Sequence, residues 1–204
     1  MAIGNLQSKF IELVKILRKR RISIACVQKT KRVGTNVRDV DEYKLWYLGS
    51  VKHRNGVGIF VDEELRGQVV EVKQVNDRLM SIRLVIGGST LVVINAYTPQ
   101  SGLDEEKKRN FWETLDEVVR GVPSTEMLFI GHNFNGHIGS LSKSYDDVHS
   151  SFDFGDQNER EVSLLDFARD FGLRVENLSF PNREKILITF CSLVTKTQID
   201  FFSP

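Results

Sequence analysis

The sequence predicts a layered α/β sandwich whose strands pair largely antiparallel. Three observations predict this fold class. The 204-residue chain opens with apolar residues at helical spacing. Short runs rich in β-branched residues follow, separated by turn residues, and two further helical stretches lie among the later strands. Because the chain is long enough for one sizeable core and shows no internal repeat or linker, we expect a single domain over residues 1–204.

The first half of the chain predicts one helix and a series of short strands. The opening helix has an apolar face formed by Leu6, Phe10, Leu13, Val14 and Leu17. A buried strand is expected at 22–28, and further strands at 43–48, 56–61, 69–75, 79–86 and 90–97. Turn residues separate them, at 54–56 and at Gly87-Gly88, which predicts a tight hairpin.

The second half predicts two more helices. Asp104 is a suitable N-cap for a helix that runs to Arg120, and its inward face holds Phe111, Leu115, Val118 and Val119. A short strand at 127–131 leads into a polar stretch, and residues 136–161 read as a long loop. A helix at 162–171 ends at Gly172, and the final strands are expected at 186–190 and 197–202.

The composition of the chain excludes few classes of function. The net charge of +1 gives no global argument for a nucleic-acid, membrane or acidic partner. The chain has neither an apolar stretch long enough to span a membrane nor a signal-peptide pattern, so we expect no membrane partner. Cys26 lies in an apolar run far from Cys191, which favours a buried thiol in a reducing compartment over a disulfide or a metal ligand.

Polar residues follow several predicted strands, which is where functional sites often form. The segments are Val27-Gln28-Lys29-Thr30, Asn95-Ala96-Tyr97-Thr98-Pro99, Gly131-His132-Asn133-Phe134-Asn135-Gly136-His137 and Gln198-Ile199-Asp200-Phe201. Each one alone is an ordinary strand end or turn. Their order along one chain carries the functional information.

This order resembles the motif order of the endonuclease/exonuclease/phosphatase superfamily, which runs Gln-Glu-Thr, Asn-x-Tyr-x-Pro, Gly-Asp-Phe-Asn, and then a strand with an aspartate between apolar and aromatic residues. Segments such as 43–47, 53–59, 111–113 and 197–201 resemble still more closely the endonucleases of LINE-type retrotransposons and the craniofacial development protein 2-like proteins. The resemblance covers nearly the whole chain. It implies a four-layer α/β/β/α sandwich, truncated here at both ends, with the site at one edge of two packed sheets.

The resemblance also implies a chemistry. Members of this family hydrolyse phosphodiesters with a divalent cation that is usually Mg²⁺. The resemblance implies that the substrate of this chain is DNA. Mg²⁺ prefers oxygen ligands and neutralises charge that develops on the phosphate. By motif position, Tyr97 contacts the phosphate or the nucleophile, Asn135 holds the scissile group, and Asp200 supports a catalytic histidine. Thr189 matches a strand residue near the substrate, and His137 is assigned only a loop role.

The departures from the family pattern concern the catalytic groups themselves. Lys29 stands where the family has its metal-binding glutamate, so we assign no metal ligand here. Asn133, preceded by His132, stands where the family has the aspartate that positions the attacking water. The family's first strand, with its active-site asparagine, has no counterpart. The family's motif order also ends with Ser-Asp-His, and this motif does not follow before the chain stops at Pro204. The resemblance therefore predicts a degraded site with hydrolysis lost or very weak.

Three hypotheses remain open. The chain is a weakly active Mg²⁺-dependent DNA endonuclease, a module that binds nucleic acid without cutting it, or a retroelement remnant without function. For the second, Lys29 and the basic end of the first helix (Lys15, Arg18 to Arg21) would contact phosphates, although the same residues also suit a solvated helix end. We expect a monomer inside the cell, in the nucleus by the retroelement resemblance, and no protein partner is identifiable.

Overall fold

The computed structural model describes residues 6–30, 34–49, 55–99 and 104–133, and within the rest of the chain residues 167, 170–172, 174–175, 190–191, 196–197 and 200–203. The chain divides into two compact units. The first comprises residues 1–96 and 123–127, and the second comprises residues 97–122 and 128–204. Each unit has a helix and strands of its own.

Among the described residues, the first unit holds one α-helix, one 3-10 helix and two groups of antiparallel strands. The elements of this unit are α1 (Leu6–Arg20), β1 (Ile24–Gln28), β2 (Gly34–Val40), β3 (Tyr43–Gly49), β4 (Val57–Asp62), the 3-10 helix η1 (Arg66–Gln68), β5 (Val69–Asn76), β6 (Leu79–Ile86) and β7 (Ser89–Tyr97). A four-stranded sheet has the order β1-β4-β3-β2, and the strands β5, β6 and β7 pair in sequence order.

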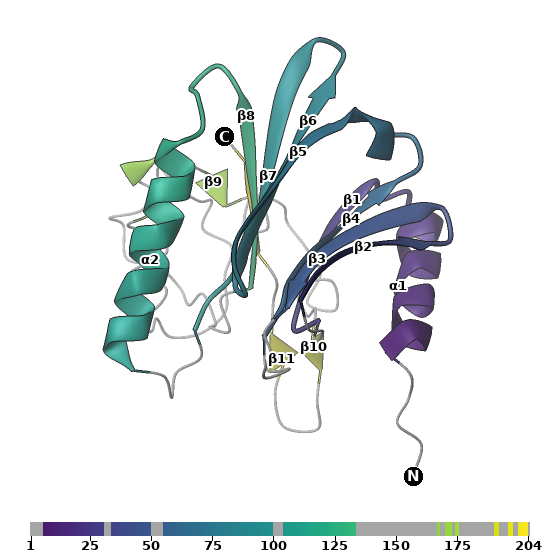
Figure 1. Cartoon of the computed structure of the whole chain (residues 1–204), viewed down its shortest axis with the longest axis horizontal. Helices are drawn as coiled ribbons and strands as arrows, with labels where there is room; N and C mark the ends of the chain where they lie inside the picture. Colours follow the sequence, from purple (N-terminus) through teal and green to yellow (C-terminus); the bar gives the residue numbers. More distant parts are fainter. Residues whose placement is uncertain are drawn as a thin grey trace. The chain divides into compact units, whose positions relative to one another are not determined.

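Helix α1 covers one face of the four-stranded sheet (Figure 1). Three residues of its predicted apolar face, Phe10, Val14 and Leu17, are buried in one cluster with residues of β3 and β4, and Leu13 packs against this cluster. Phe10 meets Phe60 edge to face, with ring centroids 5.6 Å apart. Burial of this stripe against the sheet, more than intrinsic helix propensity, stabilises α1.

The end of α1 is closed by a Schellman motif. The amide of Arg21 donates to the carbonyl of Arg18, and that of Ile22 donates to the carbonyl of Leu17, both at 3.0 Å. Arg21 has a φ of 55°, in the left-handed region that glycine usually occupies at this position. The basic residues of the last turn, Arg18 to Arg20, suit the negative end of the helix dipole.

Tyr43 connects the chain just after the end of α1 to the four-stranded sheet. Its hydroxyl donates to the backbone carbonyl of Ile22 at 2.7 Å, and the side chain is buried in the cluster beneath α1. Burial raises the pKa of the Tyr43 phenol, and the carboxylates of Asp62 and Glu42 raise it further. The phenol therefore stays protonated, as its donor role requires.

The strands β5, β6 and β7 form the second layer of the first unit, because β6 contacts β4 and β5 contacts β3. The predicted hairpin at Gly87-Gly88 is confirmed: both glycines have positive φ values, 58° and 85°, and Ile86 pairs with Ser89. Two consecutive positive φ values characterise a type I′ turn, whose twist matches the flanking strands.

The second unit contains α2 (Glu105–Arg120), β8 (Met127–Asn133, whose first residue belongs to the first unit) and short strands. These are β9 (Arg174–Val175), β10 (Phe190–Cys191), β11 (Lys196–Thr197) and β12 (Asp200–Ser203). Strand β12 pairs antiparallel with both β8 and β9, and β10 pairs with β11.

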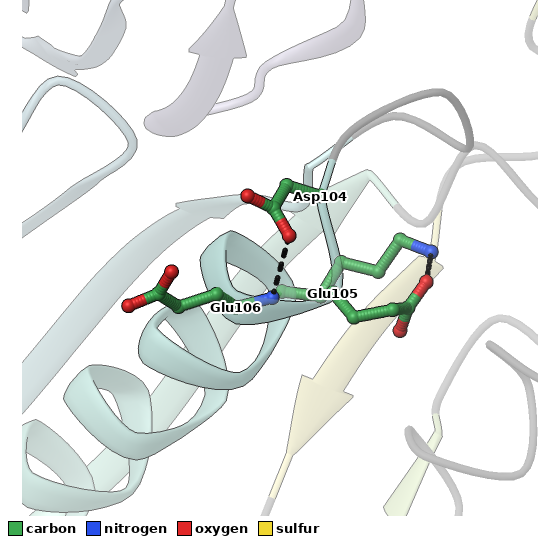
Figure 2. Close-up of polar contacts among 4 residues, drawn as sticks. Asp104, Glu105 and Glu106 are labelled. Carbon is green, nitrogen blue, oxygen red and sulfur yellow. Dashed lines mark hydrogen bonds and ion pairs between the residues drawn. The ribbon is translucent and has the colours of Figure 1, made fainter.

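The predicted cap of α2 is confirmed. The Asp104 carboxylate accepts a hydrogen bond from the Glu106 amide at 3.2 Å, and Glu105 contacts Lys108 one turn further on (Figure 2). Three of the four predicted inward residues are buried, Phe111, Leu115 and Val119, whereas Val118 is half-buried. The cap satisfies one of the amides that a helix start leaves without a partner.

The structure corrects several element boundaries. Strand β2 was not predicted, because its side chains are mostly polar and exposed and only its backbone pairing with β3 defines it. Strand β1 is half-buried throughout instead of buried, since it lies at the edge of its sheet. Cys26 on β1 is accordingly half-buried, and its sulfur is not in a disulfide. Of the expected final strand at 197–202, residue 197 lies in β11 and residues 200–202 lie in β12.

Other predictions fall mostly or wholly outside the described residues. These are the loop at 136–161, the helix at 162–171 and the strand at 186–190. Within them, Phe167 and Asp170 are helical, and Gly172 has a φ of 62°, as expected for a residue that ends a helix. Among the described helices, none is long and apolar enough to cross a membrane.

Candidate functional site

The first predicted site segment lies at the end of β1, in the first unit. Gln28 is the last residue of the strand, and Lys29 follows with a φ of 54° and an exposed side chain. A lysine in the left-handed region is strained by about 1 kcal/mol. Thr30 is only 3% exposed, and its hydroxyl has no hydrogen-bond partner among the described residues. The chain thus turns sharply at Lys29 and directs Thr30 inward.

Asn95, from the Asn-x-Tyr-x-Pro segment, is a buried bridge between the two strand layers of the first unit. Its side-chain nitrogen donates to the backbone carbonyls of Gly58 at 2.7 Å and Val27 at 3.0 Å. Its side-chain oxygen accepts from the side-chain nitrogen of Gln28 at 2.7 Å. The side chain is fully buried. All of its polar atoms are therefore engaged by protein, and Asn95 holds the end of β1 in place.

A second polar network lies beside the end of β1. The Thr30 amide donates to the Gly56 carbonyl at 3.2 Å, and the Gly56 amide donates to the Asp77 carbonyl at 3.0 Å. The Asn55 amide nitrogen donates to the Asp77 carboxylate at 2.8 Å, while its oxygen accepts from the Arg78 guanidinium at 3.1 Å. These contacts join the end of β1, the start of β4 and the turn from β5 to β6.

The remaining described candidates belong to the second unit. Tyr97 ends β7 and is only 1% exposed. Asn133 ends β8, and Asp200 begins β12. Asp200 pairs with His132, so the register brings the Asn133 and Asp200 positions to the same end of the β8–β12 pair. Asn135 and Thr189 lie outside the described residues, and their assigned roles stay predictions.

Within the described part of the chain, no three His, Cys, Asp or Glu side chains lie together as metal ligands would. At the end of β1 the exposed group is the Lys29 ammonium, and the Asn95 oxygen already accepts a hydrogen bond from Gln28. Mg²⁺ usually takes at least one carboxylate oxygen, and the segment Val27-Gln28-Lys29-Thr30 contains no carboxylate.

Sequence analysis missed the roles of Asn55, Asp77 and Arg78. Asn55 was predicted only as part of a turn, and the Asp77-Arg78 turn was not singled out. The available signal was Asn76-Asp77 between two apolar strands, which indicates a tight turn. The contacts of Asn55 with Asp77 and Arg78 span 22 and 23 positions of sequence, so only the folded chain reveals them.

No model of a known protein family matches the chain. Among curated proteins, craniofacial development protein 2 of Bos taurus is 27% identical over 172 residues, which are 84% of this chain. The matched segment is 29% of the length of that relative, so the chain spans less than a third of it.

Several solved structures share the fold. The endonuclease domain of TRAS1, a telomere-specific non-LTR retrotransposon, matches 94% of this chain and 77% of its own with a TM-score of 0.60 and 16% identity. An endonuclease/exonuclease/phosphatase family protein from Leptotrichia buccalis matches 98% and 83%, with a TM-score of 0.59 and 11% identity. D. rerio TDP2, solved with a single-strand DNA product, matches 98% and 78%, with a TM-score of 0.60 and 10% identity.

These matches confirm the predicted fold class, the α/β fold of the endonuclease/exonuclease/phosphatase type. The sequence match independently supports the predicted likeness to the craniofacial development protein 2 group. The chain therefore has the fold of the endonuclease/exonuclease/phosphatase superfamily and is related in sequence to craniofacial development protein 2.

Proposed function

We propose that the chain is a DNA endonuclease domain of retroelement origin whose phosphodiester hydrolysis has been lost, and that it acts in the nucleus. Lys29 is the observation that carries this proposal. It is exposed at the end of β1, at the motif position of the family's metal-binding glutamate. Its neighbour Gln28 is held at the strand end by Asn95. By the family resemblance, the Lys29 ammonium stands where a carboxylate would be.

The size of the electrostatic effect supports lost hydrolysis. Two unit charges roughly 4 Å apart at intermediate dielectric interact by about 4 kcal/mol, so an ammonium facing Mg²⁺ would oppose it by at most about 8 kcal/mol. Asn133 in place of the water-positioning aspartate removes a second group, and loss of one acid/base group alone costs roughly 10²- to 10⁴-fold in rate. Both changes act against hydrolysis.

A nicking assay tests this proposal. Purified chain is incubated with supercoiled plasmid and excess Mg²⁺ or Mn²⁺, with a DNase as positive control. We expect no nicking above the level of a metal-chelated sample, because the site neither attracts the cation nor orients the water. Metal-dependent nicking by the wild type that disappears in Tyr97→Phe would overturn the proposal and establish a surviving endonuclease.

A second candidate function is binding of DNA without cleavage, and the exposed Lys29 ammonium favours it. A cation at this position can attract a phosphate directly in place of a metal ion. The exposed basic residues Lys15, Arg18, Lys19, Arg20 and Arg21 would add phosphate contacts. The relative TDP2 has been solved with a single-strand DNA product, so the fold accommodates DNA in at least one relative.

Charge reversal at Lys29 tests the binding function. Fluorescence anisotropy with a labelled DNA oligonucleotide, without metal, should show salt-sensitive binding that Lys29→Glu weakens about tenfold, since one phosphate contact becomes repulsive. Lys107→Glu, which makes the same charge change on the exposed side of α2, is the matched control. Equal affinities of the wild type and Lys29→Glu would rule out a phosphate contact at this position.

A further inference from the structure

We propose that the Asn36 side chain guards the open edge of the four-stranded sheet, so that this edge does not pair with a strand of a second copy of the chain. The inference goes beyond the proposed function and does not depend on it. Strand β2 stands at the end of the sheet order β1-β4-β3-β2 and has β3 on one side. The other side of an end strand carries backbone groups with which a further strand can pair.

The amide of Val37 points toward this open edge. Val40 and Tyr43 face each other across a two-residue turn, so they form a hydrogen-bonded pair, and such pairs alternate along the hairpin. Arg38 therefore directs its backbone groups toward β3, whereas Val37 directs its own away from β3. The Val37 amide donates instead to the side-chain oxygen of Asn36, at 2.9 Å. An incoming strand must break this bond before it can accept from Val37.

The composition of β2 supports a protective role for Asn36. Asparagine is depleted in strands, because its side chain competes with the ladder for backbone hydrogen bonds. On β2 that competition acts on an amide that β3 does not use. Val37 is 48% exposed, so the same position would also offer an apolar side chain to a second strand. Asp39 adds a charge to this edge and forms an ion pair with Arg66 at 3.7 Å, and edge charges also hinder pairing.

A second end strand on the same side of the first unit is interrupted in a different way. Strand β3 contacts β5 and β4 contacts β6, so β2 and β5 end the two strand layers on one side. The pairing of β5 with β6 shifts register between Val69 and Glu71 and again between Gln74 and Asn76. Bulges of this kind twist an edge away from regular pairing. Both end strands on this side therefore carry a feature that hinders the addition of a strand.

Self-association of the full chain, measured by sedimentation velocity over a wide range of protein concentrations, tests the inference. Asn36→Leu keeps the size of the side chain but removes its oxygen. It should raise the association constant about tenfold over the wild type, because two copies no longer give up two hydrogen bonds when they pair. Thr35→Val is the matched control, since it makes the neighbouring exposed residue of β2 apolar and leaves the bond between Asn36 and Val37 in place. It should associate no more than the wild type.

If Asn36→Leu precipitates, Asn36→Gln replaces it. Glutamine keeps the polarity of the edge, but its longer side chain does not place the oxygen at the same point, so this variant should also associate more strongly than the wild type.

Proline at two neighbouring positions tests the direction of the amides. Val37→Pro removes an amide that β3 does not use, so Tm should fall by no more than about 3 °C. Arg38→Pro removes a hydrogen bond of the ladder and should lower Tm by about 10 °C. In the double variant Asn36→Leu/Val37→Pro, no amide remains at position 37 to donate to a second copy, so self-association should return to the wild-type level. Equal losses of Tm in the two single proline variants would contradict the assigned direction of the Val37 amide.

Two outcomes of the sedimentation measurements overturn the inference. In the first, Asn36→Leu has the same average mass as Thr35→Val at every concentration. In the second, Asn36→Leu associates and Val37→Pro does not reverse the association, which would place the contact away from β2. Neither outcome bears on plasmid nicking or DNA binding, by which the proposed functions are judged separately.

Discussion

Replacement of Asn95 by leucine is expected to lower the free energy of unfolding by about 4 kcal/mol, because three hydrogen bonds disappear inside the core. The carbonyls of Val27 and Gly58 lose their shared donor, and the Gln28 amide loses its acceptor. Since Asn95 is fully buried, water cannot replace these contacts without opening the structure. Urea unfolding monitored by circular dichroism measures the loss.

Asn110→Leu is the matched control, because Asn110 lies on the exposed side of α2. A substitution there should change the unfolding free energy by no more than about 0.5 kcal/mol. If Asn95→Leu and Asn110→Leu had equal effects, the side chain of Asn95 would not bridge the two strand layers of the first unit.

Asn95→Asp gives the same bridge a pH dependence. The new carboxyl has one proton to donate, to the carbonyl of Val27 or to that of Gly58, and none when ionised, so its folded-state pKa is raised above the unfolded value of about 3.9. A raised pKa contributes stability that is present below the unfolded pKa and lost as pH rises through the folded pKa. The variant should therefore be much less stable than the wild type at pH 7, with a smaller difference near pH 4.

The second large effect is expected for Gly56→Ala, which should cost about 4 kcal/mol of unfolding free energy. Gly56 has a φ of 118°, a conformation that side-chain-bearing residues rarely adopt. A Cβ atom would lie 2.2 Å from Thr30 Oγ1 and 3.2 Å from the Leu48 carbonyl oxygen. Alanine there must displace the start of β4 from the end of β1, and thermal unfolding measures the consequence.

Gly87→Ala separates backbone strain from steric overlap. Gly87 also has a positive φ, 58°, but a Cβ atom there would meet no other atom within 4 Å, so alanine should cost only about 1 kcal/mol. In a Thr30→Ala background, which removes the overlapping hydroxyl, Gly56→Ala should cost about 1 to 2 kcal/mol less than in the wild type. Equal costs at Gly56 and Gly87 would contradict the close approach to Thr30.

Local patterns were sufficient to predict most of the secondary structure. The apolar stripe of α1, the Asp104 cap of α2 and the Gly87-Gly88 hairpin each depend on residues within a few positions of one another. Strand β2 was not predicted because no local pattern of residues indicates it. Its exposed polar side chains carry no burial pattern, and its backbone becomes a strand only because β3 lies beside it.

The motif order by itself was enough to predict the superfamily fold, because strand ends that carry site residues recur in the same sequence throughout a family. It also placed Gln28, Lys29 and Asn95 at strand ends. Only the tertiary structure decided what these residues do in the fold. Gln28 and Asn95 are 67 positions apart, and their hydrogen bond exists because two strand layers pack face to face around them. The Asn55–Arg78 contact arises in the same way, from turns that the packed sheets bring together.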